Sequence, residues 1–324
     1  MIILTGGAGF IGSCFLKKLN DEGIDDIIVV DSFRNSDKWK NLVGKKFVEF
    51  LHKDEILPIL DVSQEVESKV PFDAIIHLGA CTDTTEKDMD YLFQNNYQFS
   101  TTLARFALEN DIKFIYASSA ATYGDGQEGY SDKQIENLKP LNPYGYSKQL
   151  FDIWVHRNNF DKIFTGIKFF NVFGPNEYHK GEMASMVYKA YNQVKTTGKI
   201  KLFKSNSELF ADGEQQRDFV YVKDVVEVLW KILNNKKALG IVNLGTGKAR
   251  TWNSLANSVF SALDMEPNIE YIDMPDNLMD QYQNFTQADI KKLQKSGCSV
   301  NFTSLEDSIN DYVRNYLTKS WKYY

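Results

Sequence analysis

Short apolar runs alternate with longer segments of helical spacing over the first half of the chain, and this pattern restricts the fold more than any other feature. The runs are rich in Ile, Val and Phe and occupy residues 1–7, 26–32, 71–80, 112–120 and 164–175. Between them, helical spacing is found in residues 10–23, 90–111 and 148–159. Strands separated by helices predict an α/β fold, with a parallel sheet covered on both faces and a ligand at the carboxyl ends of its strands.

The pattern loosens after Pro175. One helix is expected near residues 183–198, and strand and helix spacing returns after Arg217. We therefore expect a smaller, discontinuous substrate-binding domain in the C-terminal half. The predicted boundaries give the sheet domain residues 1–170 and 217–247, and the smaller domain residues 171–216 and 248–324.

Composition disfavours several classes of function. The formal net charge is −6 without any block of like charge, so no nucleic-acid partner is expected. The three cysteines are far apart and the four histidines show no ligand spacing, which disfavours a disulfide framework and a metal site. No apolar run approaches the roughly 20 residues of a membrane span. The chain opens without a basic segment or cleavage site, so we expect a cytoplasmic protein with no membrane partner.

The stretch TGGAGFIG follows the first apolar run and opens the first helical segment. Gly7-x-Gly9-x-x-Gly12 fits the dinucleotide fingerprint, and Gly6 adds a longer spacing. Glycine allows a tight turn and the close approach of a pyrophosphate, which then faces the amides that begin the helix. Asp31 ends the second strand 19 residues after Gly12, near the ~20 expected of a ribose-binding acid. The motif predicts a Rossmann-type, doubly wound domain that binds a dinucleotide.

The residues leave NAD and NADP open. Asp31 could bond a ribose hydroxyl, which favours NAD, whereas Arg34, Lys38 and Lys53 could hold a 2′-phosphate. The loop HLGACT after the third strand should pass the cofactor, and Asn95 could reach it from the next helix. The expected cofactor contacts are Gly6, Gly9, Phe10, Ile11, Gly12, Asp31, Ser32, Lys38, Lys53, Leu78, Gly79, Ala80, Cys81, Thr82, Asn95, Lys148 and Val172.

The stretch NPYGYSK holds two tyrosines ahead of a lysine. If it is helical, Tyr144 and Lys148 share one face, while Tyr146 is rotated ~200° away from that face. Tyr144 is therefore the chemical candidate, and Tyr146 is expected to pack. A tyrosine hydroxyl has a pKa of ~10. We expect the Lys148 ammonium and a cationic nicotinamide ring to lower the pKa of Tyr144 toward ~7.

The stretch YASSAATYG ends the fourth strand, where a substrate should meet the nicotinamide. Ser119 lies 25 residues before Tyr144, and we expect it to hydrogen-bond the reacting oxygen and pass a proton toward Tyr144. Two serines at a strand end are usually turn residues. Here the serines lie between the glycine motif and the Tyr-x-x-x-Lys motif along the chain. This combination favours a chemical role for Ser119 over a role in a turn alone.

These three motifs resemble the extended short-chain dehydrogenase/reductase family. The resemblance implies that a hydride moves between NAD(P) and a sugar-nucleotide hydroxyl. In that scheme Ser119 orients the substrate, Tyr144 is the acid/base, and Lys148 holds the ribose and tunes Tyr144. The family's 4,6-dehydratases carry an Asp-Glu pair within the serine segment. Here Ala120 and Ala121 stand in that region, so elimination of water is disfavoured.

Further stretches are similar to the ADP-L-glycero-D-manno-heptose 6-epimerase branch of this family, namely GACTDTTE, NVFGPNEYHKGEMAS, RDFVYVKDV, NLGTGKARTW and QYQNFTQADI. The resemblance implies an isomerase of ADP-heptose in lipopolysaccharide precursor synthesis. Such an enzyme oxidises the sixth carbon to a ketone with tightly bound NADP and returns the same hydride to the opposite face. The resemblance also implies a homo-oligomer, a pentamer of identical chains. The alternatives are another sugar-nucleotide epimerase or reductase, such as a UDP-hexose 4-epimerase, and a cofactor-binding scaffold without turnover.

Two epimers present their hydroxyl on different sides of the reacting carbon, which favours a second proton-handling residue. The resemblance gives that role to Lys180, with an anchor for the substrate diphosphate as the alternative, and we expect His179 to be structural. Arg217 is the best candidate for a diphosphate clamp because its planar fork matches phosphate oxygens. The expected substrate contacts are Ser119, Asn171, Lys180, Glu182, Lys189, Phe203, Arg217 and Tyr282.

Overall fold

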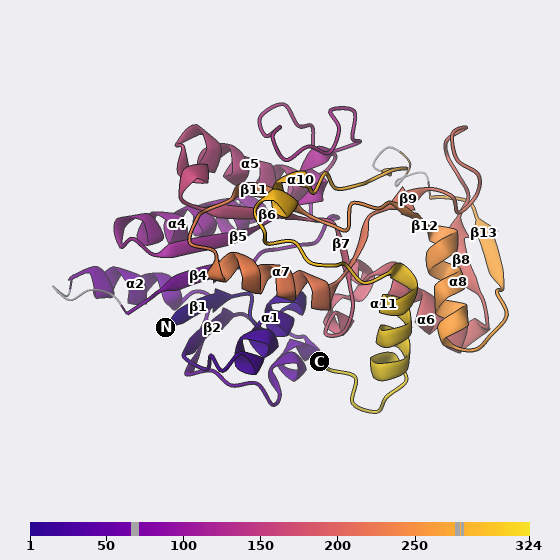
Figure 1. Ribbon diagram of the computed structural model, residues 1–324, viewed down its shortest axis with the longest axis horizontal. Coiled ribbons are helices and arrows are strands. Elements are labelled where there is room, and N and C mark those ends of the chain that lie inside the picture. Colours follow the sequence, from indigo (N-terminus) through magenta and orange to yellow (C-terminus); the bar gives the residue numbers. More distant parts are fainter. Residues whose placement is uncertain (66–70, 276–278, 280–281) are drawn as a thin grey trace.

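A parallel sheet lies at the centre of the protein, whose computed structural model describes residues 1–65, 71–275, 279 and 282–324 (Figure 1). Within these residues the sheet has seven strands in the order β11-β6-β5-β4-β1-β2-β3, all parallel. The predicted α/β fold is confirmed. The strands are β1 (Ile2–Thr5), β2 (Ile27–Asp31), β3 (Glu49–His52), β4 (Ala74–His77), β5 (Lys113–Ser119), β6 (Thr165–Phe169) and β11 (Gly240–Leu244).

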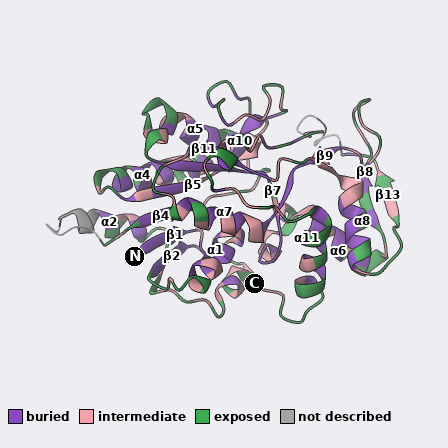
Figure 2. Cartoon of the chain, viewed as in Figure 1, coloured by how far each residue is buried: buried purple, intermediate pink, exposed green. Residues whose placement is uncertain are grey.

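Helices cover both faces of the sheet. Successive strand residues point to opposite faces, so each face carries its own set of apolar side chains that a layer of helices buries. Ile2 and Leu4 of β1 join one core with α1 (Phe10–Asp21) and α7 (Val222–Asn234). Ile3 joins a second core on the other face, with α2 (Ile56–Glu65), α4 (Phe99–Glu109) and α5 (Pro143–Arg157). Figure 2 shows the strands buried between helices whose outer sides are exposed.

Three local features differ from the sequence expectations. The edge strand β3 was not indicated, because only Leu51 of its four residues is buried. The helix expected over 90–111 is interrupted, since α3 (Met89–Leu92) leads into a π-helical turn (Phe93–Gln98) before α4 begins. The fifth predicted strand breaks after Phe169. Its second part, β7 (Asn171–Phe173), pairs with β10 (Phe219–Tyr221) instead of continuing in the main sheet.

Most of the remaining strands and helices gather beyond the carboxyl ends of the sheet strands, at the right of Figure 1. Two small strand pairs lie there: β8 (Ile200–Phe203) with β13 (Ile269–Ile272), and β9 (Gln216–Arg217) with β12 (Arg250–Thr251). The helices of this region are α6 (Met186–Thr197), α8 (Trp252–Ala262) and α11 (Leu305–Tyr312), the last followed by a π-helical turn (Val313–Leu317). Elsewhere lie α10 (Lys291–Lys295) and 3-10 turns at Asp37–Leu42, Ala120–Tyr123, Phe160–Lys162 and Tyr178–Met183. The division into two domains at the stated boundaries stays a prediction.

Candidate active site

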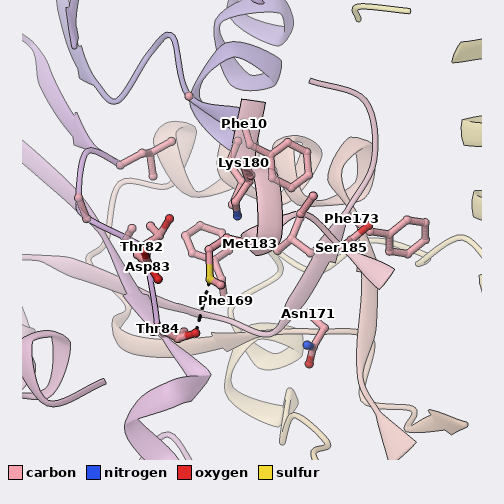
Figure 3. A pocket seen from close by; sticks show the side chains of 18 of the residues that line it. Phe10, Thr82, Asp83, Thr84, Phe169, Asn171, Phe173, Lys180, Met183 and Ser185 are labelled. Carbon is pink, nitrogen blue, oxygen red and sulfur yellow. Dashed lines mark hydrogen bonds between the residues drawn. The ribbon is translucent and has the colours of Figure 1, made fainter. Parts of the chain in front are cut away.

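A cavity of about 710 Å³ lies beside the carboxyl ends of β1, β4 and β5. Its walls come from the glycine-rich turn, the loop after β4, α5, β7 and the 3-10 turn at Tyr178–Met183. Figure 3 shows Lys180 and Phe10 on one side of this cavity and residues 82–84 on another. A cavity thus lies where the parallel strands end, the place at which a ligand was expected, and ligand binding there stays a prediction.

The turn between β1 and α1 has no room for side chains. Gly6 adopts a φ of +70°, and a Cβ there would lie 2.7 Å from the backbone nitrogen of Gly79. A Cβ on Gly12 would lie 2.1 Å from the carbonyl oxygen of Gly6. Gly6, Gly9 and Gly12 line the cavity, so backbone without side chains borders it at the start of α1, which is where a pyrophosphate is bound in dinucleotide-binding folds. The residues present fit a dinucleotide cofactor.

Asp31 holds the glycine-rich turn from the end of β2. One carboxylate oxygen accepts from the backbone nitrogen of Ala8 at 2.9 Å. The other accepts from Lys38 Nζ at 2.6 Å and from the backbone nitrogen of Ser32 at 2.7 Å. Asp31 is only 7% exposed, so water contributes little to solvating its charge. The Lys38 ammonium balances the negative charge of Asp31. The predicted ribose-binding acid is therefore already bonded within the protein.

The predicted cofactor contacts fall along two adjoining cavities, the second of about 590 Å³. The first cavity is lined by Gly6, Gly9, Phe10, Ile11, Gly12, Asp31, Lys38, Leu78, Gly79, Ala80, Cys81, Thr82, Lys148 and Val172. Ser32, Lys53 and Asn95 line the second cavity. The structure thus brings all of these residues to one continuous region, although their contact with a cofactor stays a prediction.

The π-helical turn at Phe93–Gln98 carries two asparagines with different tasks. Asn95 lines the second cavity. Asn96 is 1% exposed and bonds both backbone groups of Cys81, at 2.8 Å and 3.0 Å. Its amide also donates to Ser147 of α5 at 3.0 Å. Asn96, which the sequence did not indicate, therefore fixes the loop after β4 against the helix that carries Tyr144.

Tyr144 and Lys148 lie on one face of α5, as predicted. Asn142 caps this helix by accepting from the backbone nitrogen of Gly145 at 2.8 Å. Tyr144, Lys148 and Ser119 line the cavity together. Tyr146 is 46% exposed, so the expectation that it packs is wrong, because its side of α5 faces solvent.

The side chains of the protein alone do not lower the pKa of Tyr144. Burial raises this pKa, and a hydrogen bond with Ser119 opposes the rise. Lys148 is not among the causes of this shift, and the lowering of the Tyr144 pKa expected from Lys148 together with a cationic nicotinamide ring stays a prediction. Burial also lowers the pKa of Lys148 to about 8, against the attraction of Asp152. Lys148 Nζ donates to the backbone oxygen of Ala117 at 3.0 Å, which fixes the ammonium behind the site.

A fully buried ion pair anchors α5 to the sheet. Asp152, one turn after Lys148, lies 3.3 Å from Lys168 Nζ, and neither side chain is exposed. Asp152 also accepts from the hydroxyls of Ser118 at 2.6 Å and Tyr116 at 3.1 Å. These bonds satisfy the buried carboxylate and join α5 to β5 and β6. No sequence motif had indicated this pair, since its members are distant in the chain.

Lys180 reaches the cavity from a turn that a buried carboxylate holds. Glu177 is 1% exposed and accepts from the backbone nitrogens of Gly174 at 3.2 Å and Ser185 at 2.6 Å. Lys180 Nζ lies 5.6 Å from the ring centre of Phe10, and Figure 3 shows its side chain pointing into the cavity. Burial lowers the pKa of Lys180, and Glu177 opposes the shift. A lysine in this setting can exchange protons more readily than an exposed one.

Arg217 lies beside two aromatic rings, one of which, Trp252, lines the cavity. Its guanidinium lies 5.1 Å from the ring centre of Tyr282 and 5.5 Å from that of Trp252. Trp252 Nε1 donates to the Tyr282 hydroxyl at 2.9 Å, and Phe203 meets Tyr282 edge-on with ring centres 6.4 Å apart. Three predicted substrate contacts, Arg217, Tyr282 and Phe203, thus form one cluster, which borders the cavity only through Trp252.

The structure does not bring every predicted substrate contact into the cavity. Asn171 lines the cavity from β7. Five of the predicted contacts are not among its lining residues, namely Glu182, Lys189, Phe203, Arg217 and Tyr282. The Glu182 side chain is 93% exposed and lies 3.2 Å from Lys189 Nζ, so the two pair with each other at the surface.

Several lining residues were missed by the sequence reasoning. Phe169 and Met183 extend into the region drawn in Figure 3, and Thr84 donates to Met183 Sδ at 3.5 Å across the cavity. Trp252 begins α8. Apolar residues of this kind carry no sequence signal that separates a cavity wall from an ordinary core. Among the described residues no group of three or more His, Cys, Asp or Glu could hold a metal ion, and no helix is long and apolar enough to cross a membrane.

Comparisons with known proteins agree with this geometry. The model of a family described as the NAD dependent epimerase/dehydratase family matches residues 2–245. A protein of Nitratidesulfovibrio vulgaris strain DP4 named ADP-L-glycero-D-manno-heptose-6-epimerase is 52% identical over 321 residues, which cover 98% of each chain. One of the same name from Fusobacterium nucleatum is 48% identical over 334 residues, with both chains covered completely.

A solved structure is similar over nearly the whole chain. The crystal structure of Helicobacter pylori ADP-L-glycero-D-manno-heptose-6-epimerase matches with a TM-score of 0.81 and 30% identity, and the match covers 97% of this chain and 95% of that one. The chain therefore belongs to the NAD dependent epimerase/dehydratase family, in the branch of these heptose-6-epimerases, and uses a nicotinamide cofactor.

Proposed function

We propose that this chain interconverts ADP-D-glycero-β-D-manno-heptose and ADP-L-glycero-β-D-manno-heptose by inverting the sixth carbon, in the supply of heptose for lipopolysaccharide. The names and coverage of its relatives support this substrate. The observation that carries the chemistry is that Tyr144 and Lys180, from different elements, line one cavity. Inversion needs a proton-handling group for each of two hydroxyl positions, and these residues supply two.

A nicotinamide cofactor, held at the glycine-rich turn by Gly6, Gly9 and Gly12, would supply the redox chemistry by taking a hydride from the reacting carbon and giving it back. Tyr144 Oη would exchange a proton with the reacting hydroxyl of one epimer. The Ser119 side chain is hydrogen-bonded to Tyr144 Oη. Lys180 Nζ would exchange a proton with the reacting hydroxyl of the other epimer. Burial lowers the pKa of Lys180. Proton release from Lys180 therefore costs less free energy than proton release from an exposed lysine.

The substrate's diphosphate would lie against Arg217. Two aromatic rings and a bond to the backbone oxygen of Gln216 at 2.9 Å fix the guanidinium before any ligand binds. Little side-chain entropy is then lost on binding, and the planar donor set suits phosphate oxygens. Asn171 would hydrogen-bond the sugar from β7, whose departure from the main sheet places it in the cavity wall.

We infer that the resident cofactor is NADP. Asp31, the group that would bond a ribose hydroxyl of NAD, is already bonded by Lys38, Ala8 and Ser32. Arg34 and Lys53 line the same second cavity as Lys38 and would face a 2′-phosphate. Mass analysis of the nucleotide released from denatured protein tests this inference, and recovery of NAD alone would refute it.

The reaction is tested by incubating the protein with ADP-D-glycero-β-D-manno-heptose and resolving the two epimers. An equilibrium mixture should form from either epimer without net consumption of added NADP. Unchanged configuration at the sixth carbon would reject the proposal. UDP-galactose serves as the comparison substrate, and turnover at comparable efficiency would instead favour a UDP-hexose 4-epimerase.

The homopentamer that the resemblance implies and the cytoplasmic placement expected from the sequence belong to the same proposal. Light scattering of the purified protein measures the number of chains. A monomer at working concentration would refute the oligomer.

A further inference from the structure

Two segments that are distant in the chain are bonded to each other next to the turn that carries Lys180. Asn176, shortly before this turn, is fully buried and has a left-handed backbone with a φ of +75°. Its side-chain oxygen accepts from the backbone nitrogen of Tyr324 at 2.8 Å, and its amide nitrogen donates to the hydroxyl of Ser13 at 2.9 Å. Asn176 thus joins the segment Lys322–Tyr324 to α1, the helix that begins at the glycine-rich turn.

Tyr178, two residues before Lys180, makes a second set of contacts with this segment. Its hydroxyl donates to the backbone oxygen of Lys322. The Lys322 ammonium lies 4.5 Å from the centre of the Tyr178 ring, and the Tyr323 ring meets the same ring edge-on with centres 5.2 Å apart. A hydrogen bond, a cation and an aromatic edge therefore fix the tyrosine that begins the turn.

Tyr324 anchors the segment to the body of the protein. Its backbone oxygen accepts from Lys45 Nζ at 2.6 Å, and its ring centre lies 5.4 Å from Lys17 Nζ and 5.3 Å from Lys223 Nζ. Tyr316, in the π-helical turn after α11, meets this ring edge-on with centres 6.1 Å apart. The anchor of the segment is thus built from α1, α7 and the turn after α11, and not from the turn that carries Lys180.

The part of the turn after Lys180 gives that residue little restraint. Within the described residues, the Cβ position of Gly181 has open space around it, and the Glu182 side chain is 93% exposed. The position of Lys180 therefore depends on how the residues before it are fixed. This dependence matters for an acid/base group, because a misplacement of about 1 Å can lower a rate about 10²-fold.

We propose that the segment Lys322–Tyr324 is a positioning element, which keeps Lys180 at the reacting carbon by fixing Asn176 and Tyr178. The segment does not line the cavity, so it acts through Lys180 and not on the substrate. The inference rests on the proposed function, in which Lys180 serves one epimer and Tyr144 serves the other. Loosening the segment should therefore slow the oxidation of one epimer and leave that of the other almost unchanged.

The test uses two variants that leave every cavity-lining residue in place. Tyr178→Phe removes the hydroxyl that bonds the segment, and Tyr324→Ala removes the ring that anchors it. Tyr146→Phe is the matched control, because it removes a hydroxyl from a residue that is 46% exposed. Lys180→Met is the reference for loss of the acid/base itself, and circular dichroism checks that each variant is folded.

Two measurements are made on each holoenzyme. Stopped-flow absorbance follows the first formation of reduced nicotinamide from each epimer of the ADP-heptose separately. Hydrogen exchange of residues 176–186 is measured with nucleotide bound and without heptose. In this stretch the backbone nitrogen of Lys180 donates to the backbone oxygen of Glu177 at 3.0 Å, and that of Ala184 donates to Gly181 at 3.1 Å. The exchange measurement does not depend on the reaction, so it separates failure of this inference from failure of the proposed function.

Tyr178→Phe and Tyr324→Ala should exchange these amides about 3- to 10-fold faster than wild type and Tyr146→Phe, the range for loss of one neutral hydrogen bond. From the epimer that Lys180→Met affects, both should form reduced nicotinamide about 10- to 100-fold more slowly, and from the other epimer within about twofold of wild type. Unchanged exchange in both variants, or equal slowing from both epimers, would overturn the inference. Equal behaviour of the two epimers in Lys180→Met would instead reject the proposed role of Lys180, and this inference with it.

Discussion

Lys148 offers a test of burial that does not depend on the substrate. Its side chain is 5% exposed, and burial lowers its pKa from 10.5 to about 8. Asp152 and Cys81 attract the ammonium but do not cancel the effect. The folded protein therefore releases this proton at a lower pH than the unfolded chain does. Replacing Lys148 with methionine removes this difference, so the pH dependence of stability must change.

The sign follows from proton linkage. Below about pH 8 the lysine is charged in both states, and the folded state carries the full cost of burying an ammonium. Between about pH 8 and 10.5 only the unfolded state keeps the proton, so the free energy of unfolding rises by about 1.36 kcal/mol per pH unit. From pH 8 to pH 10 the wild type should gain about 2 kcal/mol relative to Lys148→Met, because the slope is reached only between the two pKa values and not at either one.

Urea unfolding of the nucleotide-free proteins at pH 7, 8, 9 and 10 measures this difference. Other titrating groups are shared by wild type and variant, so their contributions largely cancel in the comparison. Lys139→Met is the control, because that side chain is 75% exposed and its loss removes a charge without burial. Stability curves for wild type and Lys148→Met that stay parallel from pH 7 to 10 would refute the reasoning.

Four further predictions concern single sites. Tyr144→Phe should lower kcat by about 10²- to 10⁴-fold while nucleotide stays bound, as steady-state kinetics and nucleotide analysis would show; retained rates would contradict the assignment. Lys180→Met should lower kcat more than it raises KM, and the reverse would make Lys180 an anchor for the diphosphate. Lys168→Met removes the ion-pair partner of Asp152 and should lower the free energy of unfolding, measured in urea, by about 3–5 kcal/mol. Adding Asp152→Leu should restore most of this loss, and an equally unstable double variant would argue against charge burial as the cause. Gly12→Ala places a Cβ 2.1 Å from a carbonyl oxygen of the same turn, so the purified protein should lack absorbance from bound nucleotide, and normal nucleotide content would show that the turn can relax.

Properties that depend on local periodicity could be predicted from the sequence. The strands β1, β2 and β4 are fully buried, and buried parallel strands read as continuous apolar runs. The glycine spacing predicted the turn after β1, and the four-residue spacing on α5 selected Tyr144 over Tyr146. Each of these conclusions needs only the pitch of a helix or the steric limits of a turn. The resemblance to a known family then narrowed the chemistry and the substrate.

Only the tertiary structure decided features that join distant segments. The Asp152–Lys168 pair, the bonds of Asn96 to Cys81 and the placement of Arg217 beside two rings have no local sequence pattern. The direction of the Tyr144 pKa shift was also decided there, because desolvation depends on everything packed around a group. Backbone periodicity is a property of neighbouring residues, whereas burial and electrostatic pairing are properties of the assembled chain.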